Sequence, residues 1–186
     1  MGKLTLLPQP LSGLVVIETA AFEDHRGSFA RLFCAAELAA LGMRPIAQIN
    51  HSLTRAKGAV RGLHFQRPPK AEAKLVRCLK GRVLDVAVDL RAGSPTFLTW
   101  HAVELSAANR LALFLPRGFA HGFQTLTDDC ELLYLHDEFY SPDCEDGLRH
   151  DDPALGINWP LPVVDLSARD AAHPLVAAGF APLEIP

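Results

Sequence analysis

Polar side chains that can move protons or hold negative charge alternate with apolar ones in the stretch AVRGLHFQRPPKAEAKLVRCLKGRVLDVAVDLR. The polar residues concerned are Arg61, His64, Gln66, Lys74 and Arg77. Histidine titrates close to neutral pH and therefore suits a general base, while lysine and arginine stabilise a nearby anion. A sheet face built from these residues predicts a site for proton removal beside a group that becomes negatively charged.

A second stretch, LPRGFAHGFQTL, has the spacing Pro-x-Gly-x-x-His through Pro116, Gly118 and His121. This spacing resembles the second motif of the cupin family, in which a turn places the histidine inside a small β-barrel. The resemblance implies a jelly-roll barrel.

The first cupin motif is present only in part. Metal-binding cupins have a His-x-His pair, which shares one face of a strand. Here the matching letters are HFQ, beginning at His64, and one histidine with a glutamine does not provide the usual three protein ligands. We therefore expect no metal site and no cofactor, with His51 and His101 in surface or structural roles.

The elements that must position these residues read as strands. Short, β-branched or alternating segments recur along the chain and are separated by turn signals such as Lys80-Gly81 and Asp128-Asp129, a pattern typical of an antiparallel sandwich or barrel. The expected strands lie within 13–19, 27–33, 46–54, 59–65, 73–81, 82–90, 96–105, 111–116, 118–126 and 131–139.

Helical signals are few. The segment CAAELAALG, 34–42, combines alanine and leucine with a final glycine and is the best helix candidate. From residue 151 onward the chain is rich in proline and alanine and predicts irregular coil with short helical turns. We expect an all-β fold with a few short helices.

Length and composition limit the possible functions. A chain of 186 residues with 49% hydrophobic residues predicts one globular domain over 1–186. A net charge of −3 argues against nucleic-acid binding, and no apolar run approaches the ~20 residues of a membrane helix. The N-terminal segment lacks the apolar region of a signal peptide, and none of the four cysteines forms a Cys-x-x-Cys pair. We expect reduced thiols and a cytoplasmic protein that binds no membrane.

Nine motifs occur in the order and spacing of one known family. They are FEDHRGSF, QINHS, RGLHFQ, KLVRCLKGRVLDVAVDLR, SPTF, PRGFAHGF, YSPDCEDG, INWP and LSARD, and together they extend from Phe22 to Asp170. On these motifs the chain resembles the dTDP-4-dehydrorhamnose 3,5-epimerase family, which belongs to the cupins.

The resemblance implies the chemistry of a nucleotide-linked 4-keto-6-deoxyhexose. The ketone at C4 acidifies the hydrogens on C3 and C5, so inversion needs a base on one face and a proton donor on the other. It also needs a cation or hydrogen-bond donor at the ketone oxygen, where the charge of the enolate develops. This chemistry requires no metal and no redox cofactor.

Four residues match the family's catalytic positions. The match makes His64 the base, Asp170 the carboxylate that orients it, Tyr134 the acid and Lys74 the stabiliser of the enolate. From the residues alone, plainer roles compete. A lone strand histidine often bonds to a backbone carbonyl, Tyr134 could be a half-buried strand aromatic, Lys74 could face solvent, and Asp170 would be a helix N-cap candidate.

Further positions match the family's substrate contacts. Gln48 and Asn50 are two residues apart and so share a strand face, whereas Arg61 and His64 are three apart and face the same way only if Gly62 allows a bulge. The predicted substrate-binding residues are Arg26, Gln48, Asn50, Arg61, His121, Tyr140, Glu145 and Arg169.

Two aromatic residues near Arg26 have two possible roles. Phe22 and Phe29 could stack on the nucleotide base or fill the core, and we expect them in the core.

The chain also departs from the family pattern. Arg31 stands where the family usually has glutamate, Glu72 where many relatives have glutamine, and Leu135-His136 follow Tyr134 where lysine is usual. Arg169 replaces a lysine but keeps its charge. We expect these changes to flank the pocket and to bear on which nucleotide is bound and on whether one or both carbons are inverted.

The sequence therefore predicts a metal-free epimerase that converts dTDP-4-dehydro-6-deoxy-D-glucose to the L-rhamnose precursor, and the resemblance implies a homodimer that exchanges N-terminal strands. Three alternatives remain. The chain could invert C3 alone or act on another activated keto sugar, it could bind a sugar nucleotide without turnover, or it could be a metal-dependent oxygenase.

Overall fold

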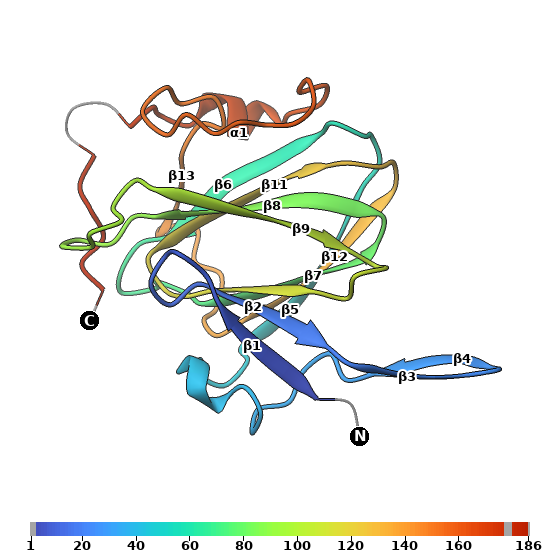
Figure 1. The fold of residues 1–186 in the computed structure, drawn as a ribbon. Helices are drawn as coiled ribbons and strands as arrows, with labels where there is room; N and C mark the ends of the chain where they lie inside the picture. Colours follow the sequence, from blue (N-terminus) through green and yellow to red (C-terminus); the bar gives the residue numbers. More distant parts are fainter. Residues whose placement is uncertain (1–2, 177–179, 186) are drawn as a thin grey trace.

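The fold is built from two antiparallel sheets that face each other (Figure 1). The structure, a computed structural model, describes residues 3–176 and 180–185, so the extreme ends of the predicted domain and residues 177–179 lie outside the described residues. The six-stranded sheet has the order β1 (Leu4–Pro8), β2 (Val15–Thr19), β10 (Ala112–Leu115), β7 (Lys74–Lys80), β12 (Cys130–His136) and β5 (Gln48–Thr54).

The second sheet has five strands. Their order is β13 (Glu145–Gly147), β6 (Val60–Gln66), β11 (Phe119–Thr125), β8 (Arg82–Asp89) and β9 (Trp100–Ser106). All described strand pairings in both sheets are antiparallel, and every strand predicted from the sequence is present. The prediction of an all-β, cupin-type double sheet is therefore confirmed.

Strand alternation sends one set of side chains between the sheets and the other set outward. On β7, Val76 and Cys78 belong to the cluster between the sheets, whereas Leu75 belongs to a second cluster on the outer face. Phe123 and Leu105 complete the inner cluster from the five-stranded sheet. Because both faces of β10 are buried, that strand appears in the sequence as the continuous apolar run ALFL.

Irregular segments cover the outer faces. The segment 33–46 contributes Leu38 and Leu41 to the cluster outside the six-stranded sheet. The stretch from Leu148 onward covers the five-stranded sheet with residues such as Leu155 and Trp159, and it carries the only described α-helix, α1 (Ala168–Ala172) (Figure 1). The predicted C-terminal coil with a short helical turn is confirmed.

The predicted helix at 34–42 is wrong in type. The segment forms turns and a short 3₁₀ helix, η1 (Ala39–Leu41), although Gly42 does end it in a left-handed conformation, with its N–H donating to Ala39 O at 3.2 Å. A nine-residue segment gains little from helix propagation alone. Packing of Leu38 and Leu41 on the sheet decides its path instead.

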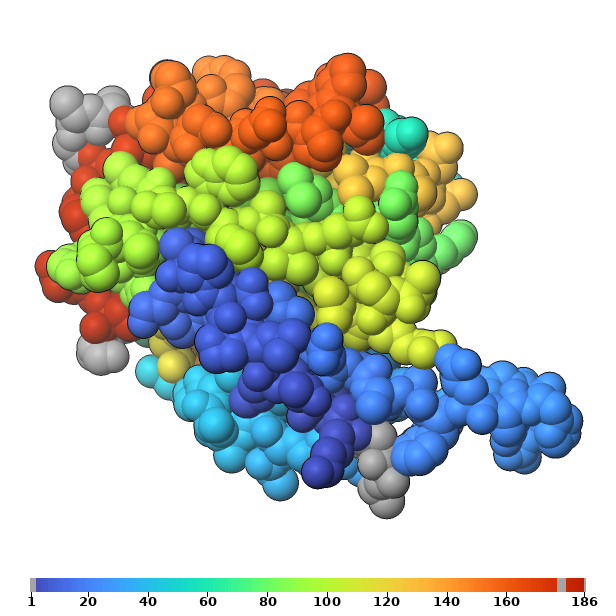
Figure 2. Space-filling model, in the orientation of Figure 1, coloured from blue at the N-terminus to red at the C-terminus, as the bar shows by residue number. Residues whose placement is uncertain are grey.

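A hairpin projects from the body of the molecule. It consists of β3 (Ala21–Asp24) and β4 (Gly27–Ala30) and stands clear of both sheets in Figures 1 and 2. The expectation that Phe22 and Phe29 fill the core is wrong, because they are 51% and 69% exposed. Two phenylalanines on a two-stranded ribbon have no second layer to cover them.

The described elements contain no helix long and apolar enough to cross a membrane.

Candidate active site

A cavity of about 330 Å³ opens between the two sheets, and most predicted site residues line it. The six-stranded sheet provides one wall through β5, β7 and β12, and the five-stranded sheet provides the other through β6, β11 and β13. The predicted residues that line the cavity are His64, Tyr134, Lys74, Gln48, Asn50, Arg61, His121, Tyr140, Glu145 and Arg169.

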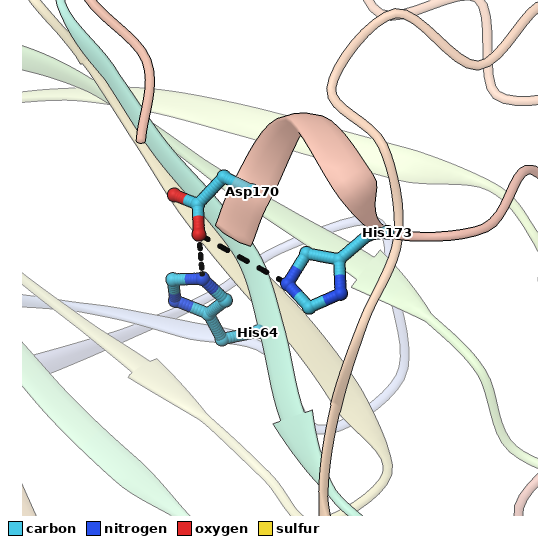
Figure 3. A group of neighbouring side chains, drawn as sticks. All are labelled: His64, Asp170 and His173. Atoms are coloured by element: carbon cyan, nitrogen blue, oxygen red, sulfur yellow. Dashed lines mark hydrogen bonds and ion pairs between the residues drawn. The ribbon is translucent and has the colours of Figure 1, made fainter. Parts of the chain in front are cut away.

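Asp170 lies directly behind His64. His64 Nε2 and Asp170 Oδ1 are 2.8 Å apart (Figure 3). The Gly62 N–H donates to Asp170 Oδ2 at 3.1 Å. Burial raises the pKa of Asp170, but the bonds from His64 and Gly62 outweigh it and hold that pKa well below its ordinary value. A charged carboxylate only accepts hydrogen bonds, so His64 Nε2 donates to Asp170, and in the neutral ring Nδ1 is the nitrogen with the free lone pair.

Helix α1 is what places Asp170 there. The helix N-cap is Ser167, whose hydroxyl accepts from the Asp170 N–H at 3.0 Å. Asp170 therefore lies in the first turn rather than at the cap position, which corrects the plainer interpretation from sequence. The capped turn directs the carboxylate toward β6.

A bulge in β6 brings Arg61 and His64 to the same cavity. His64 pairs with His121 and Arg61 with Phe123, so three steps along β6 match two steps along β11. The extra residue restores a common face and confirms the bulge expected at Gly62. Gly62 has φ +118°, and a Cβ there would lie 2.6 Å from Gly122 Cα, so only glycine fits this close approach.

Tyr134 lies on the opposite sheet from His64. Its hydroxyl is 3.1 Å from Ser52 Oγ on β5. Burial raises the pKa of Tyr134 above the ordinary tyrosine value, so the hydroxyl stays protonated through neutral and mildly alkaline pH. In this protonated form the side chain can donate a proton.

Lys74 is buried and paired, contrary to the solvent-facing alternative. Its ammonium lies 2.9 Å from Glu72 Oε1 and 3.5 Å from His64 O. The other oxygen of Glu72 is 2.7 Å from His136 Nδ1. The expectation that Glu72 and His136 merely flank the pocket is wrong, because both line the cavity and Glu72 contacts a predicted catalytic residue.

His121 is held by a fully buried carboxylate. Both oxygens of Asp85 lie 3.0 Å from His121 Nε2, and the His121 ring meets the Tyr134 ring edge-on at 6.1 Å. This second histidine–aspartate pair holds the His121 ring against Tyr134 at the cavity wall. Asp85 was not among the predicted site residues.

The entrance of the cavity is polar. Tyr140 donates its hydroxyl to Glu145 Oε2 at 2.8 Å, and Arg169 Nη1 lies 3.0 Å from Glu145 Oε1. The Tyr140 N–H donates to Gln48 Oε1 at 2.9 Å. Hydrogen bonding to Glu145 raises the pKa of Tyr140. Arg169 and Arg61 supply positive charge here, next to a neighbouring groove that both also line.

Arg26 is not brought to this cavity by its own chain. It stands at the turn of the β3–β4 hairpin, where it forms an ion pair with Asp24 at 2.6 Å. The two histidines given structural roles do make such bonds, His51 to Glu131 and His101 to Gln9, although His51 also borders the cavity.

One group among the described residues offers three metal-ligand atoms close together. These atoms belong to His64, Asp170 and His173 and lie within 4.8 Å of one another (Figure 3). Arg169 already reaches this group, with Nη2 3.3 Å from His64 Nε2 and Nε 3.5 Å from Asp170 Oδ1. A guanidinium in this position opposes a second cation through charge repulsion, so the group fits a hydrogen-bonded dyad better than a metal centre.

Comparisons with known proteins agree with the geometry. Residues 8–178 match the family model described as dTDP-4-dehydrorhamnose 3,5-epimerase. The chain is 43% identical over 176 residues to the dTDP-4-dehydrorhamnose 3,5-epimerase of Salmonella typhimurium, covering 93% of this chain and 96% of that protein. It is 38% identical to the dTDP-4-dehydrorhamnose 3-epimerase of Streptomyces niveus, covering 94% of this chain and 84% of that protein.

A solved structure gives the same result for the fold. The dTDP-4-dehydrorhamnose 3,5-epimerase of Bacillus anthracis, solved with TDP and pyrophosphate bound, matches with a TM-score of 0.90 and 38% identity, covering 93% of this chain and 99% of that chain. Sequence and fold therefore agree over nearly the whole length. The chain belongs to the dTDP-4-dehydrorhamnose 3,5-epimerase family, whose members are epimerases and hence isomerases.

Proposed function

We propose that this protein inverts C3 and C5 of dTDP-4-dehydro-6-deoxy-D-glucose and forms dTDP-4-dehydro-L-rhamnose, a step toward dTDP-L-rhamnose. The single observation that carries this proposal is the placement of His64 and Tyr134 on opposite sheets around one cavity. Epimerisation needs a base and an acid on the two faces of the sugar ring, and the barrel provides one from each wall.

The base and the acid act in sequence. His64, with its proton on the side of Asp170, uses its free nitrogen to remove the proton next to the ketone. The electrons move to the ketone oxygen, and Lys74 stabilises the resulting enolate. Tyr134 then returns a proton to the same carbon from the opposite face, which inverts it. Proton exchange with water restores both residues.

The nucleotide end is bound by the polar entrance. Arg61 and Arg169 contact the diphosphate, since a guanidinium can bind two phosphate oxygens at once. Arg169 is 55% exposed and can leave Glu145 when a phosphate arrives. Gln48, Asn50 and Tyr140 orient the sugar nucleotide from the other wall.

The working unit is a homodimer of single-domain chains in the cytoplasm. The exposed Phe22, Arg26 and Phe29 of the β3–β4 hairpin support this part of the proposal. A projecting ribbon with two uncovered aromatic rings is suited to contact a second chain, and Arg26 can then reach the partner's cavity.

A C3-only epimerase is the second candidate, because one relative is named a 3-epimerase. The deciding experiment is NMR of the purified enzyme with the keto sugar in deuterated water, following C3 and C5 separately. Deuterium at both carbons with inversion supports the proposal, and deuterium at C3 alone supports the second candidate. Absence of exchange at both carbons would indicate a protein that binds the sugar nucleotide without turnover.

Exhaustive chelation should leave the rate of turnover unchanged. A loss of activity that one divalent ion restores would contradict metal-free catalysis.

A further inference from the structure

A chain of hydrogen bonds follows one wall of the cavity. Glu72 receives the Lys74 ammonium at 2.9 Å on Oε1 and the His136 ring at 2.7 Å on Oε2. The far nitrogen of that ring, His136 Nε2, lies 3.4 Å from Asn50 Nδ2. Two residues with a role in the proposed function, Lys74 and Asn50, are thus joined through two residues that it does not use.

The members of this chain are rigidly held. The side chains of Glu72 and His136 are 8% and 9% exposed. The ring of His136 also stacks on the ring of Tyr134, with centroids 6.1 Å apart and planes at 22°. A buried ring that is stacked on one side and bonded through both nitrogens has little freedom to turn.

The charge of Glu72 fixes the direction of the hydrogen bonds. Burial raises the pKa of Glu72, but Lys74 and His136 outweigh it and lower that pKa to about 2. A carboxylate only accepts, so His136 Nδ1 must donate to it. In the neutral ring Nε2 then accepts, and it receives the N–H of Asn50. The amide oxygen of Asn50 is left for a ligand in the cavity.

We propose that His136 is a positioning residue that links Glu72 to Asn50. Through the His136 ring, the Glu72 carboxylate sets the orientation of the Asn50 amide, so that Asn50 presents its amide oxygen to the substrate. The identity of that substrate rests on the proposed function. The inference adds that the substrate group facing Asn50 is a hydrogen-bond donor, a sugar hydroxyl or a ring N–H of the base. The same carboxylate holds Lys74, so the two substrate contacts are set by one anion.

The direct test is the position of the ring proton. Nitrogen-15 NMR of the full-length enzyme at about pH 8, above the value of about 6.5 where histidine ordinarily titrates, should show His136 protonated at Nδ1. Comparison with His136→Leu identifies the signal. In Glu72→Gln, the glutamine carbonyl pairs with Lys74 and its N–H faces His136, so the ring proton should move to Nε2.

The matched control is Glu138→Gln. Glu138 also bonds a lysine, Lys70, but does not line the cavity, so this variant should leave the His136 proton on Nδ1. A wild-type ring protonated at Nε2, or the same tautomer in wild type and Glu72→Gln, would overturn the proposal. The position of the ring proton can be measured even if the protein turns over no keto sugar. The proposal about His136 can therefore be contradicted independently of the proposed function.

Kinetics supply the functional readout. Removing the bond to Asn50 in His136→Leu should raise KM by about 3- to 10-fold with a smaller change in kcat. Reversing it in Glu72→Gln should raise KM by a similar factor, while kcat falls further because Glu72 also holds Lys74. Because both variants act through Asn50, the double variant should raise KM no further than either single one. Effects that multiply, or KM values within about twofold of wild type, would overturn the proposal.

Discussion

Two of the proposed catalytic side chains, His64 and Lys74, are each paired with a buried carboxylate. Asp170 accepts the hydrogen bond that fixes the tautomer of His64. Glu72 forms an ion pair that holds the ammonium of Lys74. The pairs place charge on carboxylates that lie behind the cavity-lining groups, so an imidazole, an ammonium and a protonated phenol face the cavity. That combination suits proton transfer next to an enolate.

The lowered pKa of Asp170 predicts that Asp170→Asn lowers the free energy of unfolding by an amount that depends on pH. The folded protein favours the charged form, so this stabilisation is complete above the unfolded pKa of about 3.9 and is lost as pH falls through the lower folded pKa. Denaturant unfolding at pH 7 should show a free energy of unfolding about 1.5–3 kcal/mol lower in the variant.

The difference in the free energy of unfolding between wild type and Asp170→Asn should become smaller below about pH 4. Asp143 is exposed, so Asp143→Asn is the matched control and should leave the free energy of unfolding unchanged. A gap of constant size down to pH 3 would show that Asp170 does not stabilise the fold through its charge.

Sequence spacing identified some of these residues and could not identify others. His136 lies two positions after Tyr134 on the same strand, so strand alternation alone could have placed it on the cavity face. Glu72 precedes the start of β7, so alternation does not place it. By contrast, His64 and Asp170 are 106 positions apart. Only the family resemblance predicted their contact. No local sequence pattern encodes it, because it forms when the C-terminal helix α1 packs against β6.

At the scale of elements, alternation predicted most strands and missed three short ones. The strands β6, β7, β11 and β12 carry clear β-branched or alternating patterns and appear where expected. The missed strands β1, β3 and β13 are short and lie at sheet edges or in the hairpin. An edge strand has one partner and a weaker demand for buried side chains, so its sequence pattern is weaker too.

The β3–β4 hairpin makes a prediction of its own. Arg26→Ala should raise KM for the nucleotide sugar about tenfold or more, with a smaller change in kcat, because a diphosphate contact remote from the reacting carbons binds ground and transition states alike. Steady-state kinetics measure both parameters. The control is Arg82→Ala, another exposed arginine with a single acidic partner, Glu104, and it should leave KM unchanged.

Because Arg26 lies outside the cavity of its own chain, the contact requires a second copy. Sedimentation should therefore give about twice the chain mass of 20.2 kDa. A monomer, or a collapse of kcat with KM unaltered, would show that the hairpin does not supply a diphosphate contact to a partner.

At the scale of the whole molecule, the two sheets separate the proposed acid from the proposed base. His64 belongs to the five-stranded sheet and Tyr134 to the six-stranded sheet, so a sugar ring between the walls meets one group on each face. The jelly-roll expectation followed from short strands and the second cupin motif. Sequence alternation could not predict that His64 and Tyr134 lie on opposite walls, because that placement depends on the sheet to which each strand belongs.

The most direct test of this account is deuterium wash-in followed by NMR in His64→Ala and Tyr134→Phe, with His101→Ala as the control imidazole outside the cavity. His64→Ala should lose both turnover and exchange at C3 and C5 by at least ~10²–10⁴-fold. Tyr134→Phe should keep exchange while losing inversion, since the base still forms the enolate and returns a solvent proton to the same face. Exchange that persists in His64→Ala, or inversion retained in Tyr134→Phe, would contradict the two-walled mechanism.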